Sequence, residues 1–375
     1  MRGKLSINSF IKKLFGKNYP YINKRLKLFK NRFKFNLSKK KPSQKIVARE
    51  SGFILDFTKN NFLTFHLRPK DFHDFNLEST CSIEDKMGIV IQGPIQENFD
   101  FLKNTLKIYE KIFKNSLIVI STWESEDINK IKNLINERVH VIFNREPQKS
   151  ISNIDHQTLS TSAGLDYLHT KKIKYVLKLR ADIRLNKNNL ESFLTTLIKF
   201  FPILKKNETI NSRIIVPSIN TYKYRLYSLT DIVMFGEISD LINYFDKEPY
   251  KIGIKKFNLQ KDSILINDTP LVAEIFLCAR YLQKIEKDLK WDLDNWWISL
   301  KNYFCIIDNS SLDLLWFKYE WDYEFKYTRT YSHKFARALD FQDWFSLYNG
   351  SKDNWNKASS VHEKYDEKME IKNLY

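Results

Sequence analysis

Cysteine is scarce in this chain, and its three cysteines lie far apart in the sequence, at Cys81, Cys278 and Cys305. No Cys-x-x-Cys spacing occurs, so we expect no structural zinc site. An odd and sparse set of cysteines also argues against a disulfide framework and fits a reducing compartment. The chain has only nine glycines and nine prolines in 375 residues, which excludes collagen-like and low-complexity character.

The short motifs of several large enzyme classes are missing. Neither Gly-x-Gly-x-x-Gly nor Gly-x-x-x-x-Gly-Lys-Ser/Thr occurs, which argues against a dinucleotide-dependent dehydrogenase and a P-loop ATPase. Gly-x-Ser-x-Gly and His-Glu-x-x-His are absent too, which argues against an α/β-hydrolase and a zinc protease. We therefore expect no organic cofactor.

Long apolar runs are also lacking. No stretch approaches the roughly 18 apolar residues that a membrane-spanning helix needs. The apolar residues near the N-terminus are interrupted by Lys12 and Lys13, so no secretory signal is predicted. These absences predict a cytoplasmic protein.

The net charge of +18 is distributed unevenly. Residues 1–50 contain 16 Lys or Arg and one acid, Glu50, so this segment carries +15 and leaves +3 for the other 325 residues. Cations that alternate with aromatic side chains suit an anionic membrane surface. The same composition suits nucleic acid, or a tail that is merely solvated. We expect residues 1–50 to contact the anionic inner leaflet of the membrane, and we expect no nucleic-acid partner.

From residue 87 onward, short apolar segments alternate with segments of helical periodicity. Such alternation predicts βαβ units and an α/β fold, a Rossmann-like, mainly parallel sheet with helices on both faces. We divide the chain into a basic segment (1–50), an unassigned lead-in (51–86), an α/β domain (87–290) and an aromatic-rich region (291–375) that completes or caps it. Strands are predicted at 88–92, 117–120, 139–143, 175–179 and 213–217, and helices at 99–113, 128–135, 153–170 and 190–201.

Polar residues follow three of the predicted strands. They are Gln92-Gly93, Ser121-Thr122-Trp123 and Arg180-Ala181-Asp182. Because ligands bind outside the carboxyl ends of parallel strands, we expect these segments to meet at one ligand-binding edge.

The fourth strand has the most informative end. The apolar run Tyr175–Leu179 stops abruptly in Arg180, Asp182 and Arg184. Arginine can donate two parallel hydrogen bonds to phosphate oxygens, and a carboxylate can hold a divalent cation such as Mg or Mn that bridges to the phosphates. The cluster therefore fits the diphosphate end of a nucleotide sugar. The alternative is a salt-bridge cluster on the surface at the end of a strand.

The predicted helix 153–170 carries a stripe of small or amide residues, with Asn153, Gln157, Ser160 and Gly164 at i, i+4, i+7 and i+11. Such a stripe can donate hydrogen bonds to a ribose or a base, or it can face solvent. Glycine inside a helix costs roughly 1 kcal/mol relative to alanine and usually permits a close approach.

Two acids further along the chain are candidates for general-base work. Asp231 immediately precedes an apolar strand, where it can orient an acceptor hydroxyl or simply cap a turn. Glu274 lies in a helix-like apolar stretch, where burial would raise its pKa toward that of a base, unless it lies on the helix surface.

Residues 291–375 hold seven of the eight tryptophans. Aromatic faces can stack on sugars, although core packing is the commoner use of tryptophan.

Together, five segments resemble the WavE lipopolysaccharide synthesis family over roughly residues 87–280. They are Ile89–Ile95, Ser121–Glu124, the helix that carries Asn153, Gln157 and Gly164, the strand end Lys178–Arg184, and Asp231–Gly236. This family comprises bacterial proteins of surface-polysaccharide biosynthesis that look like glycosyltransferases. The predicted strand order is similar to the glycosyltransferase A fold, in which an acidic motif follows the fourth strand.

The resemblance implies transfer of a sugar from a nucleotide-sugar donor to a lipid-linked lipopolysaccharide or capsular glycan. We expect the protein to be peripheral on the cytoplasmic face of the inner membrane. Rival hypotheses are a non-catalytic scaffold of a polysaccharide assembly complex, a nucleic-acid-binding protein, and a sugar nucleotidyltransferase.

Each candidate residue has a predicted role in that transfer. Arg180 and Arg184 would stabilise the leaving diphosphate, and Asp182 would do so directly or through Mg or Mn. Glu274 or Asp231 would be the base. The nucleotide would be bordered by Gln92, Gly93, Thr122, Asn153 and Gln157.

Overall fold

The computed structural model describes most of the chain from residue 86 to residue 350. The described ranges are 86–95, 99–148, 153–204, 209–223, 225–247, 273–286, 289–290, 292–319 and 339–350. All of them belong to the second of two units, residues 66–375. The predictions for residues 1–50, and for residues 51–86 apart from Lys86, lie outside the described residues.

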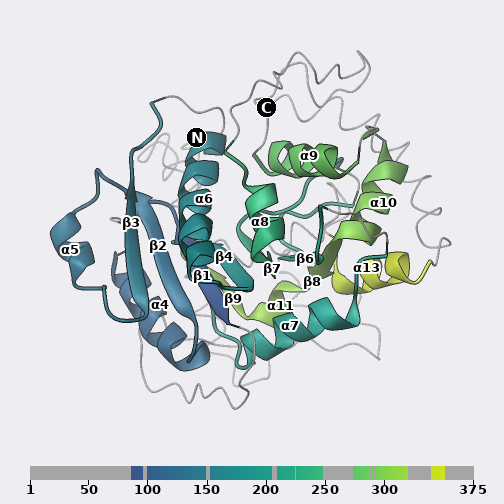
Figure 1. Cartoon of the computed structure of the whole chain (residues 1–375). Coiled ribbons are helices and arrows are strands. Elements are labelled where there is room, and N and C mark those ends of the chain that lie inside the picture. Colours follow the sequence, from purple (N-terminus) through teal and green to yellow (C-terminus); the bar gives the residue numbers. More distant parts are fainter. Residues whose placement is uncertain are drawn as a thin grey trace, which may run out of the picture. The chain divides into compact units, whose positions relative to one another are not determined.

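A seven-stranded sheet forms the centre of this unit, with the strand order β3-β2-β1-β4-β7-β6-β8 (Figure 1). Strands β1 to β4 are parallel, β7 is antiparallel to its neighbours β4 and β6, and β8 is parallel to β6. The predicted α/β class with a mainly parallel sheet is therefore confirmed. The strand bounds are Met87–Gln92 (β1), Leu117–Trp123 (β2), Val139–Asn144 (β3), Tyr175–Arg180 (β4), Ile214–Pro217 (β6), Val233–Glu237 (β7) and Phe304–Ile307 (β8).

Helices alternate with the strands, as the periodicity predicts. Helix α6 packs on β1, β2 and β3 and lies beside α8, which packs on β4 and β7 (Figure 1). Among the described helices, none combines the length and the apolarity that crossing a bilayer requires. The helix bounds are Phe99–Ile112 (α4), Ile128–Lys132 (α5), Ile154–Thr170 (α6), Leu190–Phe200 (α7), Ile238–Tyr244 (α8), Ala273–Ile285 (α9), Leu293–Tyr303 (α10), Asn309–Leu312 (α11) and Phe341–Tyr348 (α13).

Helix α6 approaches the sheet closely at Gly164. A Cβ atom added to this glycine would lie 2.6 Å from Cγ1 of Val90 on β1, closer than real Cβ contacts. Ser160, one turn earlier, is fully buried. The small residues of the predicted stripe therefore let the helix pack against β1, and at these two positions the stripe does not face solvent.

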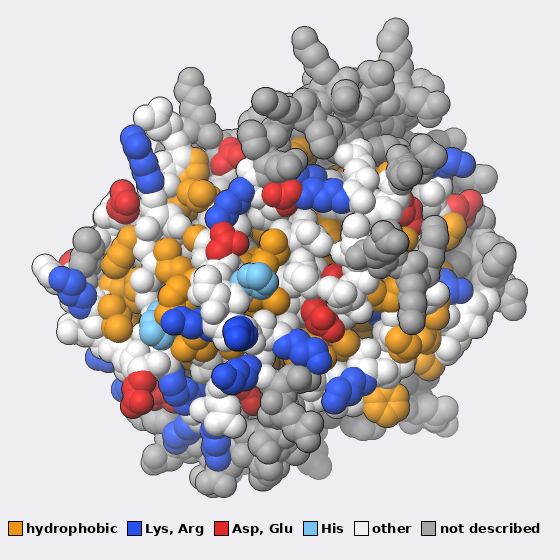
Figure 2. All heavy atoms as spheres, viewed as in Figure 1, with side chains coloured by type: hydrophobic (Ala, Val, Ile, Leu, Met, Phe, Trp, Pro, Cys, Tyr) orange, Lys and Arg blue, Asp and Glu red, His pale blue; other side chains and the backbone are white. Residues whose placement is uncertain are grey.

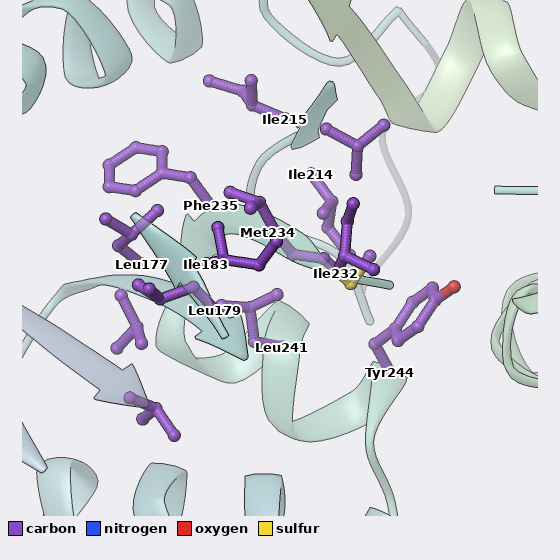
Figure 3. Close-up of a cluster of buried hydrophobic side chains, with 14 of the residues drawn as sticks. Leu177, Leu179, Ile183, Ile214, Ile215, Ile232, Met234, Phe235, Leu241 and Tyr244 are labelled. Carbon is purple, nitrogen blue, oxygen red and sulfur yellow. The ribbon is translucent and has the colours of Figure 1, made fainter. Parts of the chain in front are cut away.

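An apolar core lies beneath the end of β4, between β4, β6, β7 and α8 (Figure 3). The labelled side chains include Leu177 and Leu179 of β4, Met234 of β7 and Leu241 of α8, and all four are almost completely buried. Truncating one such side chain to alanine typically costs about 2–5 kcal/mol. This core fixes the position of the strand end that carries Arg180.

The aromatic-rich C-terminal region contributes β8 to the same sheet, through its pairing with β6. Its tryptophans Trp296, Trp297 and Trp344 are buried, and each indole N–H donates to a backbone carbonyl. These three side chains are therefore core residues, as the commoner use of tryptophan suggests.

A second, two-stranded sheet extends from the end of β4. Here β5 (Ile183–Leu185) pairs antiparallel with β9 (Leu314–Trp316). The pairing places Trp316 beside Ile183, one residue after Asp182.

Acidic and basic side chains both occur across the face of the molecule in Figure 2.

Candidate functional site

The polar strand ends meet at one edge of the sheet, as the sequence predicts. Gln92 at the end of β1 is in register with Ser121 of β2 and with Arg180 of β4. The backbone of Gly93 turns away there with φ of 109°, and its N–H donates to the Ser121 carbonyl at 3.1 Å. A Cβ atom at Gly93 would meet nothing within 4 Å, so open space lies in front of this backbone.

Arg180 and Asp182 form a two-pronged ion pair at this edge. Arg180 donates to Asp182 through Nε at 2.9 Å and through Nη2 at 3.0 Å. Trp316 adds a third hydrogen bond, from Nε1 to Oδ2 of Asp182 at 2.8 Å. The Asp182 side chain is 7% exposed and that of Arg180 is 29% exposed, so the guanidinium is the more accessible partner.

This donor set does not fit the predicted Mg or Mn at Asp182. Both of its carboxylate oxygens already accept N–H donors, so a divalent cation at Asp182 would compete with the guanidinium of Arg180 for the same carboxylate. Among the residues that the structure describes, no group of three or more His, Cys, Asp or Glu side chains is placed to hold a metal ion. In this geometry the Asp182 carboxylate orients Arg180.

Arg184 lies elsewhere. Its side chain is fully buried, and it donates to Oγ1 of Thr105 at 2.9 Å and to the Phe101 carbonyl at 3.0 Å. Its guanidinium lies 4.3 Å from the centre of the Phe101 ring. The sequence led us to expect Arg184 beside Arg180 at the end of the fourth strand, but Ala181 and Asp182 form a turn, and Arg184 lies in the next strand, β5. Arg184 therefore ties β5 to α4, and its placement does not support a contact with phosphate.

The two candidate bases lie near the end of β4. Because β7 is antiparallel to β4, the residues before β7 lie beside Arg180, whose N–H donates to the Ile232 carbonyl at 3.2 Å. Asp231 is 1% exposed, and its Oδ2 accepts no hydrogen bond from the described residues. Burial, together with the negative charge of Asp231, raises the pKa of Glu274 to about 7.

Cations balance these carboxylates. Lys178 is fully buried and donates to the backbone carbonyl of Asp231. Burial lowers the pKa of Lys178 to about 8, and the charge of Asp231 acts against this decrease. Burial alone would lower the pKa of Arg180 too, but the charges of Asp182, Asp231 and Glu274 outweigh it and raise that pKa. The edge therefore holds a firmly charged guanidinium beside a carboxyl group that titrates near neutrality.

Sequence reasoning missed Arg225, which lies in the loop between β6 and β7. Its positive charge acts on Glu274, against the rise of that carboxyl pKa. Its Nε is buried and has no hydrogen-bond partner among the described residues. The sequence carries no motif at this position, and the one available signal is that the same loop leads into Asp231.

Gln92 and Thr122 are buried beneath the edge. Oε1 of Gln92 accepts a hydrogen bond from the Ser160 hydroxyl at 2.9 Å, and Thr122 donates to Oε1 of Glu126 at 3.4 Å. Glu126, which the sequence did not single out, also accepts from the Ile95 N–H at 2.7 Å. These contacts hold the turn after β1 in place.

Asn153 and Gln157 lie at the start of α6. Asn153 is the exposed N-cap, with left-handed φ of 59° and no side-chain capping bond. Oε1 of Gln157 is buried without a hydrogen-bond partner among the described residues. Both remain candidates for a nucleotide contact.

Residues 87–374 match the model of a family described as WavE lipopolysaccharide synthesis. The match confirms the resemblance, extends it beyond residue 280 to the C-terminal region, and agrees with the prediction that the chain is a transferase. A search of curated proteins finds no match to this sequence.

Solved structures show only remote similarity. A cytidylyltransferase from Leptospira borgpetersenii serovar Hardjo-bovis is 13% identical, with 74% of this chain and 97% of that chain covered and a TM-score of 0.32. A glycosyltransferase involved in the glycosylation of the major capsid of PBCV-1 is 12% identical, with 44% of this chain and 69% of that chain covered and a TM-score of 0.26. HddC from Yersinia pseudotuberculosis is 9% identical, with 41% of this chain and 78% of that chain covered and a TM-score of 0.27. Scores this low carry no argument about fold or function.

Proposed function

Because the chain belongs to the WavE lipopolysaccharide synthesis family, we propose that it is a glycosyltransferase of surface-polysaccharide synthesis. Its donor is a nucleotide sugar, and its acceptor is a lipid-linked lipopolysaccharide or capsular glycan. The transfer forms a bond between the acceptor oxygen and the anomeric carbon and breaks the bond to the donor phosphate. The acceptor hydroxyl loses a proton, and the nucleotide leaves with an additional negative charge.

The two ends of this reaction need opposite charges. The leaving nucleotide needs a cation, and Arg180 supplies a partly exposed guanidinium that Asp182 holds in one orientation. The acceptor hydroxyl needs a base, and Glu274 is suited because its pKa of about 7 lies near the working pH.

Asp231 acts on Glu274 through charge. It is almost completely buried, and its negative charge favours the protonated form of Glu274. A carboxylate whose conjugate acid has a raised pKa accepts a proton more readily than the carboxylate of an ordinary surface glutamate does. We therefore assign the base to Glu274 and a tuning role to Asp231.

The observation that carries the proposal is the pairing of a pKa-shifted carboxyl group, Glu274, with the oriented cation Arg180 at the carboxyl edge of a mainly parallel sheet. Perturbed titratable groups with specific charge partners gather at functional sites. Ligands of open α/β sheets bind at this same edge.

A thermal-shift panel tests the donor class. UDP-, GDP- and CMP-sugars are added to the full chain, each with and without Mn. We expect at least one nucleotide sugar to raise the unfolding temperature. If none does, the non-catalytic scaffold becomes the better hypothesis.

Transfer with the donor so identified tests the residues. We expect Glu274→Gln to lower kcat by roughly a hundredfold or more, as loss of a general base does. Glu110→Gln removes an exposed carboxylate on α4 and should keep full activity. Equal activity of the two variants would remove Glu274 from the mechanism.

A further inference from the structure

The loop that carries Arg225 is held at both of its ends. The Tyr222 N–H donates to the Ser228 carbonyl at 3.1 Å, and the Ser228 N–H donates to the Arg225 carbonyl at 3.2 Å. Two tryptophans of α10 add further hydrogen bonds. Trp296 Nε1 donates to the Tyr222 carbonyl at 3.0 Å, and Trp297 Nε1 donates to the Lys223 carbonyl at 2.8 Å.

The strand directions place this loop at the same edge as Arg180. The loop joins the end of β6 to the start of β7, and β7 is antiparallel to β4. The start of β7 therefore lies at the end of β4. The charges agree with this placement, because Arg225 and Arg180 both act on the Glu274 carboxyl.

The guanidinium of Arg225 has unused hydrogen-bonding capacity. Its Nε is buried without a partner among the described residues. A buried donor without an acceptor is costly, so a ligand that supplies an acceptor at this position would bind favourably. Arg180 donates to Asp182 through Nε and Nη2, so its third guanidinium nitrogen, Nη1, takes no part in that ion pair.

We propose that Arg225 and Arg180 together bind the diphosphate of the donor, and that these two guanidinium groups take the place of a divalent cation. Two positive charges match the two negative charges of a nucleotide-sugar diphosphate. Arginine suits the task because its planar fork can donate two hydrogen bonds to one phosphate group. This inference rests on the proposed transferase function, and it deepens that function by naming the phosphate-binding residues.

Isothermal titration of the full chain with UDP, GDP, UMP and GMP tests the proposal, in EDTA and again in Mn. We expect wild type to bind UDP or GDP in EDTA as tightly as in Mn. Arg225→Ala should weaken that diphosphate roughly tenfold to a hundredfold, the range for one charge-assisted hydrogen bond. It should weaken the matching monophosphate less, since fewer phosphate contacts are lost. A merely structural role would weaken both nucleotides equally.

Lys171→Ala is the matched control, because it removes one exposed cation after α6, just before β4 begins and so at the opposite edge of the sheet. It should bind every nucleotide as wild type does. Arg225→Lys should recover part of the affinity if charge is what matters, and circular dichroism verifies that each variant is folded.

Three further outcomes contradict the proposal. Unchanged diphosphate binding by Arg225→Ala removes Arg225 from the site. Binding that occurs in Mn and is lost in EDTA shows that a metal ion is needed, and either result leaves the transferase function standing. If wild type binds none of the nucleotides in either buffer, the diphosphate site fails, and the thermal-shift panel, which also contains CMP-sugars, then decides whether the transferase function stands.

Discussion

The indole N–H of Trp316 donates to Oδ2 of Asp182 at 2.8 Å, although 134 residues separate the two side chains in sequence. The short β5–β9 pairing brings them together. Asp182 then holds Arg180, so the orientation of this cation depends on a tryptophan from the C-terminal region.

Trp316→Phe should weaken donor binding, because it keeps an aromatic ring but removes the hydrogen bond that positions Asp182. We expect the KM for the donor to rise severalfold and the free energy of unfolding to fall by about 1–3 kcal/mol, since Oδ2 of the buried Asp182 loses one of its two donors. Steady-state kinetics and urea unfolding measure the two effects.

Trp344→Phe is the matched control. Trp344 also donates its indole N–H, in this case to the Leu300 carbonyl at 3.2 Å. It should lose stability without any change in the KM. If both variants raise the KM equally, the Trp316 contact has no specific role in donor binding.

The pH dependence of transfer should report Glu274. Burial and the charge of Asp231 raise its pKa from 4.5 to about 7, and the base must be ionised to accept a proton. We therefore expect kcat/KM to increase as pH rises through about 7. Asp231→Asn should move this increase to lower pH, because the negative charge that disfavours ionisation is removed.

The same pKa shift predicts a change in stability of defined sign. Between pH 4.5 and about 7 the folded state holds the Glu274 proton more firmly than the unfolded chain does. Stability from this group is therefore present at low pH and is lost as pH rises through that window. Glu274→Gln should flatten the decrease in urea unfolding experiments. An unchanged slope would mean that Glu274 has an ordinary pKa.

Arg184 and Arg180 should separate stability from activity. Arg184→Met removes the hydrogen bonds that Arg184 donates to the Phe101 carbonyl and to the Thr105 hydroxyl, so we expect a loss of about 1–3 kcal/mol in unfolding free energy. The donor affinity of the folded variant should equal that of wild type. Arg180→Met should weaken donor binding and should also lower the unfolding free energy, because the buried Asp182 carboxylate loses two hydrogen bonds. Weak donor binding by a well-folded Arg184→Met variant would restore Arg184 as a phosphate ligand.

Much of the fold follows from local sequence patterns, and the site follows only in part. Apolar runs and helical periods predict the strands and helices because each element buries one face or both. The burial of Arg184 against α4 could not be predicted, because no local signal marks the turn that separates β4 from β5. Arg225 could not be predicted from the sequence. Its loop is placed near Glu274 by the strand order and by the hydrogen bonds from the tryptophans of α10, and both are tertiary features.

Gly164→Ala should destabilise the protein, although alanine favours helix by about 1 kcal/mol over glycine. The new Cβ would lie 2.6 Å from Val90 Cγ1, and such overpacking typically costs about 1–3 kcal/mol. The cost should shrink in a Val90→Ala background, and a double-mutant cycle in urea measures this coupling. Additive effects would mean that the helix adjusts without touching Val90.

The basic segment should decide whether the protein binds membranes. Residues 1–50 carry +15 of the total charge of +18, and each cation near an anionic surface contributes about 1 kcal/mol. Deletion of residues 1–45 should abolish co-sedimentation with vesicles that contain anionic lipid, while transfer to a soluble acceptor continues. Vesicles of neutral lipid are the control and should bind neither form. If the shortened chain sediments with anionic vesicles as the full chain does, the segment is not the membrane contact. If the full chain instead binds arbitrary RNA with a steep dependence on salt, nucleic acid is the partner of this segment.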